Sequence, residues 1–281
     1  MVVSSPAGRF PTEDELMQLL PDCVGFLAGV EPVTAKVLES AQSLRVISRN
    51  GTGIDNIDLD AARRLNIKVC TAEGANARGV AELTMALILS ITRAIPYSDA
   101  RLKKGEWKRK NGIELKGRTL GLIGCGRIGQ EVACLALGFN MRVLAHDPVQ
   151  TGFVTPSLLC QYASFEEVLS KSDILSLHCP PLSDGKALVC ADTIGVMKKG
   201  IYIINTARGS LLKEDEVLEA LERGHIAGLA TDAFRTEPPE DLELLQHENV
   251  IATSHIGGFT TESVDRAMEA AVDNLLSELG N

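Results

Sequence analysis

The sequence predicts an α/β protein with a large, open parallel sheet covered by helices and a smaller α/β unit that precedes it. Two observations predict this class. From about residue 119, short β-branched runs alternate with amphipathic helical stretches, a pattern typical of βαβ units in a parallel sheet. The earlier residues repeat the alternation on a smaller scale, and a chain of 281 residues is long enough for two domains.

The elements follow from this alternation in chain order. In the first part we expect strands at 25–28, 44–48 and 67–71 and helices at 33–41 and 59–65. Residues 77–95 form one long, mostly apolar helical pattern, which suits a core helix, a hinge helix or a subunit interface. A last amphipathic helix at 261–279 would return to the first domain. Six strands are expected in the larger sheet, at 119–124, 142–147, 174–178, 201–206, 228–234 and 250–255. Helices such as 127–137 and 213–223 are expected between them.

A glycine pattern lies between the first strand of the larger sheet and the next helix. The run LGLIGCGRIG places Gly124, Gly126 and Gly129 in the spacing Gly-x-Gly-x-x-Gly. In dinucleotide-binding folds the first glycine permits a tight turn, the second lets the pyrophosphate approach the backbone, and the third packs the helix against the strand. The N–H groups of Arg127 and Ile128 would bind the phosphates. The larger domain is therefore predicted to be a doubly wound Rossmann domain.

An acidic residue closes the next predicted strand. Asp147 follows Gly129 by 18 residues. A carboxylate at this place accepts hydrogen bonds from the adenosine ribose and repels a 2′-phosphate. The sequence thus predicts NAD rather than NADP as the cofactor.

Three residues suited to chemistry follow the last three strands. They are Arg208, Glu237 and His255, separated by 29 and then 18 residues. Because the carboxyl ends of parallel strands meet along one crevice, we expect the three side chains to converge there. Taken singly, Arg208 is also compatible with a surface ion pair and His255 with a capped strand end. Together, a cation, a carboxylate and an imidazole suit the reversible oxidation of a hydroxy acid.

Composition narrows the classes of partner. Lys and Arg total 28 against 37 Asp and Glu, a net charge of −9, so neither nucleic acid nor an anionic membrane is an expected partner. The seven cysteines form no metal-ligand spacing and no even disulfide set, so we expect no metal and a cytoplasmic protein. Residues 101–118 carry eight basic and two acidic residues. This segment is expected to be a solvated connection above a packed Trp107, or a positive rim for an anionic substrate.

Several stretches together resemble one known family. They are GTGIDNIDLDAA (51–62), LKGRTLGLIGCGRIGQEVA (115–133), LHCP (177–180), INTARGSLL (204–212), TDAFRTEPP (231–239) and SHIGGFT (254–260). In this order they resemble the D-isomer-specific 2-hydroxyacid dehydrogenases, and within them most closely the 3-phosphoglycerate dehydrogenases. The resemblance implies a smaller flavodoxin-like substrate domain, residues 1–73 with 259–281, and a Rossmann NAD-binding domain, residues 74–258. Compared with the family's pattern, the substrate domain is expected to lack its first strand and helix.

The resemblance also implies roles for individual residues. His255 would be the general acid–base, oriented by Glu237, while Arg208 would bind the substrate's carboxylate and carbonyl groups. In the smaller domain, the backbone N–H groups of Asn50 and Gly51 would hold the substrate carboxylate. The remaining residues would line the cofactor, at the nicotinamide or at the adenosine: Thr206, Ala207, Asp232, His255, Gly257, His178 and Pro180.

The substrate stays open among small D-2-hydroxy acids and their 2-oxo partners. The resemblance favours 3-phosphoglycerate, and the alternatives are glyoxylate, hydroxypyruvate or another 2-oxo acid. A third reading is an NAD-binding, corepressor-like protein, because such relatives keep the same three residues. The apolar pattern over 77–95 favours a homodimer.

Overall fold

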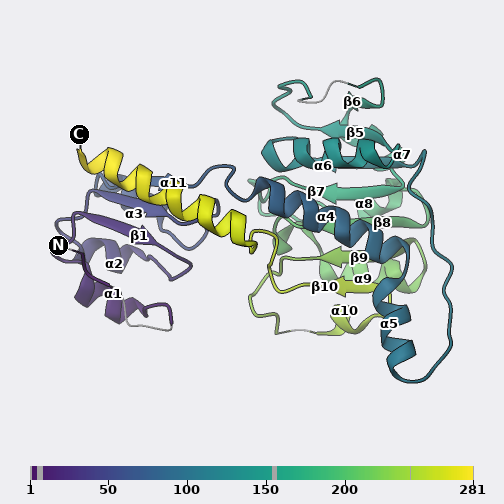
Figure 1. The fold of residues 1–281 in the computed structure, drawn as a ribbon, viewed down its shortest axis with the longest axis horizontal. Helices are drawn as coiled ribbons and strands as arrows, with labels where there is room; N and C mark the ends of the chain where they lie inside the picture. Colours follow the sequence, from purple (N-terminus) through teal and green to yellow (C-terminus); the bar gives the residue numbers. More distant parts are fainter. Residues whose placement is uncertain (1, 5–8, 154–156, 241, 281) are drawn as a thin grey trace. The chain divides into compact units, whose positions relative to one another are not determined.

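The structure is a computed structural model that describes residues 2–4, 9–153, 157–240 and 242–280. Contacts divide the chain into two compact units (Figure 1), which are treated separately below. Unit 1 contains residues 1–76 and 259–281, and unit 2 contains residues 77–258. The first boundary falls three residues after the one placed at 73 from the sequence.

Unit 1 is built on a three-stranded parallel sheet in the order β1-β2-β3. The strands are β1 (Gly25–Ala28), β2 (Val46–Arg49) and β3 (Lys68–Thr71), and the helices are α1 (Glu13–Leu19), α2 (Ala35–Ser40), α3 (Leu59–Arg64) and α11 (Thr261–Gly280). Helix α11 packs against all three strands. A Cβ on Gly25 would lie 2.8 Å from the side chain of Leu279, so this glycine allows the close approach of α11 to β1.

Helix α1 was not expected from the sequence, although it carries a local signal. The side chain of Thr12 accepts a hydrogen bond from Glu15 N, and the Glu15 side chain accepts one from Thr12 N, which is a capping box. Leu16 is buried in the core of unit 1. A single short apolar face was too weak a periodic pattern to identify this helix.

Unit 2 contains a seven-stranded parallel sheet in the order β10-β9-β8-β7-β4-β5-β6. The strands are β4 (Thr119–Ile123), β5 (Arg142–His146), β6 (Cys160–Tyr162), β7 (Ile174–Leu177), β8 (Ile201–Asn205), β9 (Ile226–Thr231) and β10 (Val250–Ala252). The strand order reverses direction between β4 and β7, as in a doubly wound Rossmann sheet. The predicted fold class is confirmed, and β6 is a seventh strand that the sequence analysis missed. It has three residues at the edge of the sheet, two of them half-buried and one exposed.

Helices cover both faces of this sheet. One buried cluster joins the sheet to α4 (Ala77–Thr92) and α6 (Arg127–Gly138), which pack on each other (Figure 1). A second cluster joins the opposite face to α7 (Phe165–Lys171), α8 (Ala191–Val196), α9 (Glu214–Glu222) and α10 (Glu243–Gln246). The sheet is therefore a buried layer, and its carboxyl edge is left for loops.

Helix α4 is shorter than the expected helix over 77–95. It ends at Thr92, Ala94 has a φ of +48°, and α5 (Ile95–Lys103) begins with Pro96 near its N-terminus. Most apolar residues of α4 are buried within unit 2, so α4 is a core helix of this unit, and its use as a subunit interface stays a prediction. Trp107 was expected to be packed but is 78% exposed.

No described helix is by itself long and apolar enough to cross a membrane. Helices α4 and α5 pass such a test as a pair, but they are bent by 62° at their junction.

Candidate functional site

The glycine loop between β4 and α6 has the shape of a pyrophosphate cradle. Gly124 has a φ of +93°, and a Cβ there would lie 2.6 Å from the carbonyl of His178. A Cβ on Gly129 would lie 2.4 Å from Gly124 O, whereas one on Gly126 would meet nothing within 4 Å. The first and third glycines thus permit close packing, and the second leaves the backbone open to a ligand. Since α6 begins at Arg127, its N-terminal N–H groups point toward the same space.

Asp147 lies directly after β5 and is tied to this loop. Its Oδ2 accepts a hydrogen bond from Cys125 N at 2.7 Å, and its Oδ1 accepts one from Val149 N at 2.8 Å. The two N–H donors fix the orientation of the carboxylate. The contact of Asp147 with the adenosine ribose stays a prediction. The two hydrogen bonds hold the carboxylate in one orientation before any ligand binds.

His178 follows β7 at the same edge and has an unpaired ring nitrogen. Its Nε2 lies 2.9 Å from Ser176 Oγ, while Nδ1 is buried and has no partner among the described residues. Burial lowers the pKa of His178 to about 4, so the ring is neutral near pH 7. An unpaired buried polar atom costs free energy, and a ligand bound beside it would remove that cost. Pro180 lies two residues further on and is exposed.

The structure brings Glu237 and His255 together as the sequence predicted. His255 Nδ1 lies 2.8 Å from Glu237 Oε1 and 2.9 Å from Oε2. Phe234 N donates to Glu237 Oε1 at 3.1 Å and so fixes the carboxylate. Both side chains are partly exposed, at 49% for His255 and 40% for Glu237. Since Nδ1 is engaged by the carboxylate, Nε2 is the ring nitrogen left for proton exchange with a ligand.

The backbone around His255 is held by Asp232, a role that sequence reasoning missed. Asp232 is 2% exposed and follows β9. Its Oδ1 accepts from Thr253 Oγ1 at 2.6 Å and from Ile256 N at 2.8 Å, and its Oδ2 accepts from Gly257 N at 2.8 Å. His255 itself has a φ of +54°, a conformation that costs a non-glycine residue free energy. Three bonds from residues on both sides of His255 stabilise this conformation.

Asp232 therefore stabilises the loop that carries His255, in addition to the nicotinamide contact that the sequence predicts for it. The sequence signal was a single carboxylate, Asp232, directly after the mostly apolar run IAGLAT at 226–231. Such a residue is rarely buried without hydrogen-bonding partners. The pattern could have identified a buried anchor, but not which backbone N–H groups it would bind.

We expect Asp232→Asn to lower kcat, by about tenfold or more, because the amide nitrogen meets N–H donors and displaces His255. Thr253→Val removes one of the same hydrogen bonds and is expected to lower kcat in the same direction. Steady-state kinetics and the Kd of NADH, measured by fluorescence, check both variants. A weaker NADH affinity in Asp232→Asn, with Thr253→Val like the wild type, would show that the cofactor contact dominates instead.

Arg208 lies on a loop that touches the loop carrying Glu237. Asn205 at the end of β8 is fully buried, and its side chain donates to Arg208 O at 2.9 Å and accepts from Ala207 N at 3.1 Å. A Cβ on Gly209 would lie 2.1 Å from the backbone of Phe234, so the glycine lets the two loops meet. The guanidinium of Arg208 donates from Nη1 to Ala207 O at 2.8 Å. The three predicted catalytic residues thus stand on neighbouring loops of one edge.

The other predicted residues occupy two places. In unit 2, Thr206 Oγ1 lies 3.0 Å from Thr84 Oγ1 of α4, which ties this loop to the helix. In unit 1, Asn50 and Gly51 follow β2, and Gly51 has a φ of +142°. Their contact with a substrate stays a prediction.

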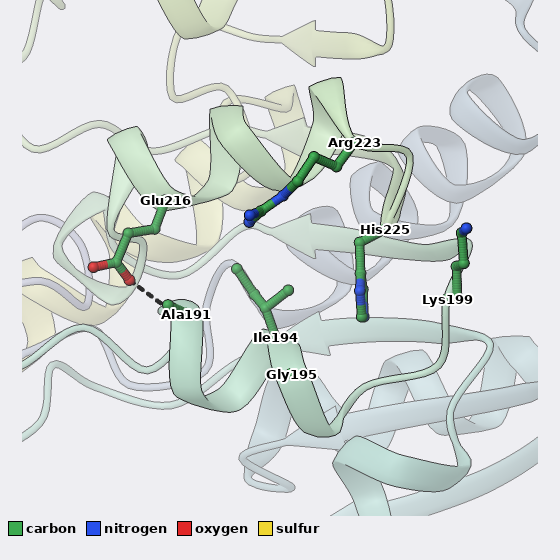
Figure 2. Close-up of a pocket in the computed structure, with 7 residues that line it drawn as sticks. All are labelled: Ala191, Ile194, Gly195, Lys199, Glu216, Arg223 and His225. Atoms are coloured by element: carbon green, nitrogen blue, oxygen red, sulfur yellow. Dashed lines mark hydrogen bonds between the residues drawn. The ribbon is translucent and has the colours of Figure 1, made fainter.

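A separate cavity of about 230 Å³ lies at the amino ends of β8 and β9 (Figure 2). It contains none of the predicted site residues. Three of its polar side chains have partners within the protein: Glu216 accepts from Ala191 N, Arg223 pairs with Glu219 at 3.0 Å, and the His225 ring lies 3.2 Å from Met197 O. These contacts join α8, α9 and their turns.

The described residues contain no group of three or more His, Cys, Asp or Glu side chains arranged to hold a metal ion. The doubly wound sheet, the glycine cradle and the residues at its carboxyl edge define a dinucleotide-binding α/β protein. Comparison with known proteins defines its family.

Residues 85–257 match the model of the D-isomer specific 2-hydroxyacid dehydrogenase NAD binding domain. The human D-3-phosphoglycerate dehydrogenase is 40% identical over 261 residues, which are 92% of this chain and 49% of that protein. The hydroxypyruvate reductase of Thermotoga maritima is 39% identical over 274 residues, 95% of this chain and 89% of that protein. The structure of D-lactate dehydrogenase from Aquifex aeolicus, complexed with NAD and lactic acid, has 32% identity and a TM-score of 0.80 over 96% of this chain and 86% of that one.

The chain belongs to the D-isomer specific 2-hydroxyacid dehydrogenase family, and it carries the family's NAD-binding domain. It spans about half the length of the human phosphoglycerate dehydrogenase.

Proposed function

We propose that the protein is an NAD-dependent dehydrogenase that transfers hydride between the nicotinamide and C2 of a small D-2-hydroxy acid or 2-oxo acid. The observation that carries this proposal is the pair of His255 and Glu237 at 2.8 Å, at the edge of the sheet that also bears the glycine cradle. A corepressor-like role needs a recognition groove for a protein partner. No described feature favours that alternative over the enzyme.

The protein's own residues have distinct tasks in the proposed reaction. NAD, when bound, supplies the hydride acceptor. His255 Nε2 takes the proton of the substrate hydroxyl during oxidation and returns it during reduction. Glu237 holds the ring by Nδ1 and stabilises its cationic form. Arg208 binds the substrate carboxylate with two parallel N–H groups, which orients C2 as well as supplying charge.

Two substrates are favoured by different relatives. The resemblance to phosphoglycerate dehydrogenases supports 3-phosphoglycerate as the substrate. The resemblance to the hydroxypyruvate reductase of Thermotoga maritima, which covers 89% of that protein, supports hydroxypyruvate. The test is oxidation of NADH, followed by absorbance, with hydroxypyruvate, its 3-phosphate, glyoxylate and 2-oxoglutarate, repeated with NADPH. We expect turnover with NADH and one preferred acid. Tight binding of NADH without turnover of any acid would support the corepressor-like alternative.

We also propose a homodimer, formed through α5 and the segment after it rather than through α4. Ile95, Leu102 and Trp107 are 52%, 58% and 78% exposed, so a monomer would leave these three large apolar side chains in water. Several basic residues of 101–118 pair locally, among them Arg101 with Glu106 and Lys110 with Glu248. This pairing weakens the alternative of a positive rim for substrate.

We expect the double variant Leu102→Glu, Trp107→Glu to be monomeric, because two buried charges would be costly at a subunit interface. Size-exclusion chromatography with light scattering checks this. Leu276→Glu, on exposed α11, is the matched control and should leave the mass unchanged. A dimeric double variant would place the interface elsewhere.

A further inference from the structure

Two charged residues of opposite sign lie around the loop that we propose for the substrate carboxylate. Asn50 and Gly51 form this loop after β2, and Asn50 N donates to Ala28 O, at the end of β1, at 2.8 Å. Arg49 is the last residue of β2. Glu31 lies three residues after the end of β1. Neither residue was among the site residues predicted from the sequence.

The guanidinium of Arg49 lies against the loop. Its Nη1 donates to Asn50 O, and a Cβ on Gly51 would lie 2.9 Å from the same nitrogen. Its Nε is buried without a partner among the described residues. Burial lowers the pKa of Arg49, and the charges of Glu31 and Asp55 act in the opposite direction. Arg49 therefore supports the loop backbone and already has two carboxylates near it.

Glu31 is held in place from several sides. It is 4% exposed, and its Oε1 accepts a hydrogen bond from Gly29 N at 2.8 Å. A Cβ on Gly29 would lie 2.7 Å from Glu31 Oε2, so no other residue fits there without a shift. Asn56 Nδ2 donates to Glu31 O at 2.7 Å and to Gly29 O at 3.2 Å. Asn56 thus fixes the backbone of the turn, and the Glu31 carboxylate cannot rotate into solvent without losing its hydrogen bond from Gly29 N.

The charges of Arg49, Glu31 and Asp55 sum to −1. A substrate carboxylate can still be held by backbone N–H groups, which donate hydrogen bonds to it. A phosphate group brings about −1.5 to −2 further charge near pH 7. In partly buried surroundings water screens that charge poorly, so a phosphorylated acid meets repulsion that a single carboxylate largely avoids.

We propose that Glu31 is a specificity-determining residue that directs the site toward unphosphorylated, monoanionic 2-oxo acids, such as hydroxypyruvate or glyoxylate, and against 3-phosphorylated acids. This inference rests on the proposed dehydrogenase function and selects between its two substrates.

The test compares kcat/KM for hydroxypyruvate and for its 3-phosphate, with saturating NADH, in the wild type and in Glu31→Gln. The wild type should prefer hydroxypyruvate. Glu31→Gln keeps an acceptor for Gly29 N and should shift the ratio toward the phosphate by roughly tenfold, the effect of removing one nearby charge. Glu39→Gln is the control: it makes the same change in net charge on exposed α2, where Glu39 pairs with Arg64 at 3.6 Å, and should leave the ratio unchanged.

A second measurement on the wild type needs no variant and covers the case in which Glu31→Gln fails to fold. Added salt screens charge, so it should improve kcat/KM for the phosphate relative to hydroxypyruvate. A cationic phosphate site gives the opposite trend. Preference of the wild type for the phosphate, loss of that activity with salt, or an unchanged ratio in folded Glu31→Gln would each overturn the proposal. Failure of both acids and of glyoxylate to turn over, despite NADH binding, would reject the dehydrogenase function itself.

Discussion

Replacement of His255 by glutamine is expected to lower kcat by roughly 10²- to 10⁴-fold, the usual contribution of a positioned general acid–base. Glutamine keeps a polar side chain of similar reach, but it does not exchange a proton near pH 7. The geometry makes the test specific, since Nδ1 is bound to Glu237 at 2.8 Å and Nε2 remains for the substrate. Stopped-flow reduction of the preferred 2-oxo acid measures the effect on the chemical step.

Two controls accompany this variant. The Kd of NADH should stay unchanged, which shows that the glycine cradle is intact and the loss lies in proton transfer. Glu237→Gln should have a smaller effect, because the amide can still orient the ring but no longer stabilises its cation. Turnover of His255→Gln at the wild-type rate would sink the assignment of His255 as the acid–base.

Replacement of Arg208 by lysine is expected to lower kcat/KM by roughly 10²-fold, although the charge is kept. The planar fork of arginine binds a carboxylate through two parallel N–H groups, which lysine does not reproduce. Arg208→Ala should lose more and should also lower kcat, since C2 is no longer held in line with the hydride acceptor. Initial rates over a range of acid concentrations separate KM from kcat.

The control for Arg208 is an arginine of the same domain outside the site. Arg142 begins β5 and is exposed, at the opposite end of the strand from the carboxyl edge. Arg142→Ala should have wild-type kinetics with all acids. Equal losses in Arg142→Ala and Arg208→Ala would indicate a general effect of net charge instead of a substrate contact.

The large sheet could be predicted because its central strands carry a strong signal. Buried parallel strands are continuous apolar runs, and β4, β7 and β8 have this character. The edge strand β6 escaped because only three residues pair with a neighbour there. The end of α4 at Thr92 was also misplaced, since Ile95 continues the apolar pattern after the left-handed turn at Ala94.

Residue types and their order along the chain were sufficient to predict the doubly wound fold, the glycine loop and the contact of Glu237 with His255. These features depend on local periodicity and on the rule that parallel strands end at one edge. The contacts of Asp232 with Thr253, Ile256 and Gly257, and the burial of Glu31 beside Gly29, were decided by tertiary structure alone. The contacts of Asp232 join residues far apart in sequence, and the contact of Glu31 depends on the conformation of the turn at Gly29. A buried carboxylate accepts hydrogen bonds from the N–H groups that the folded chain places beside it.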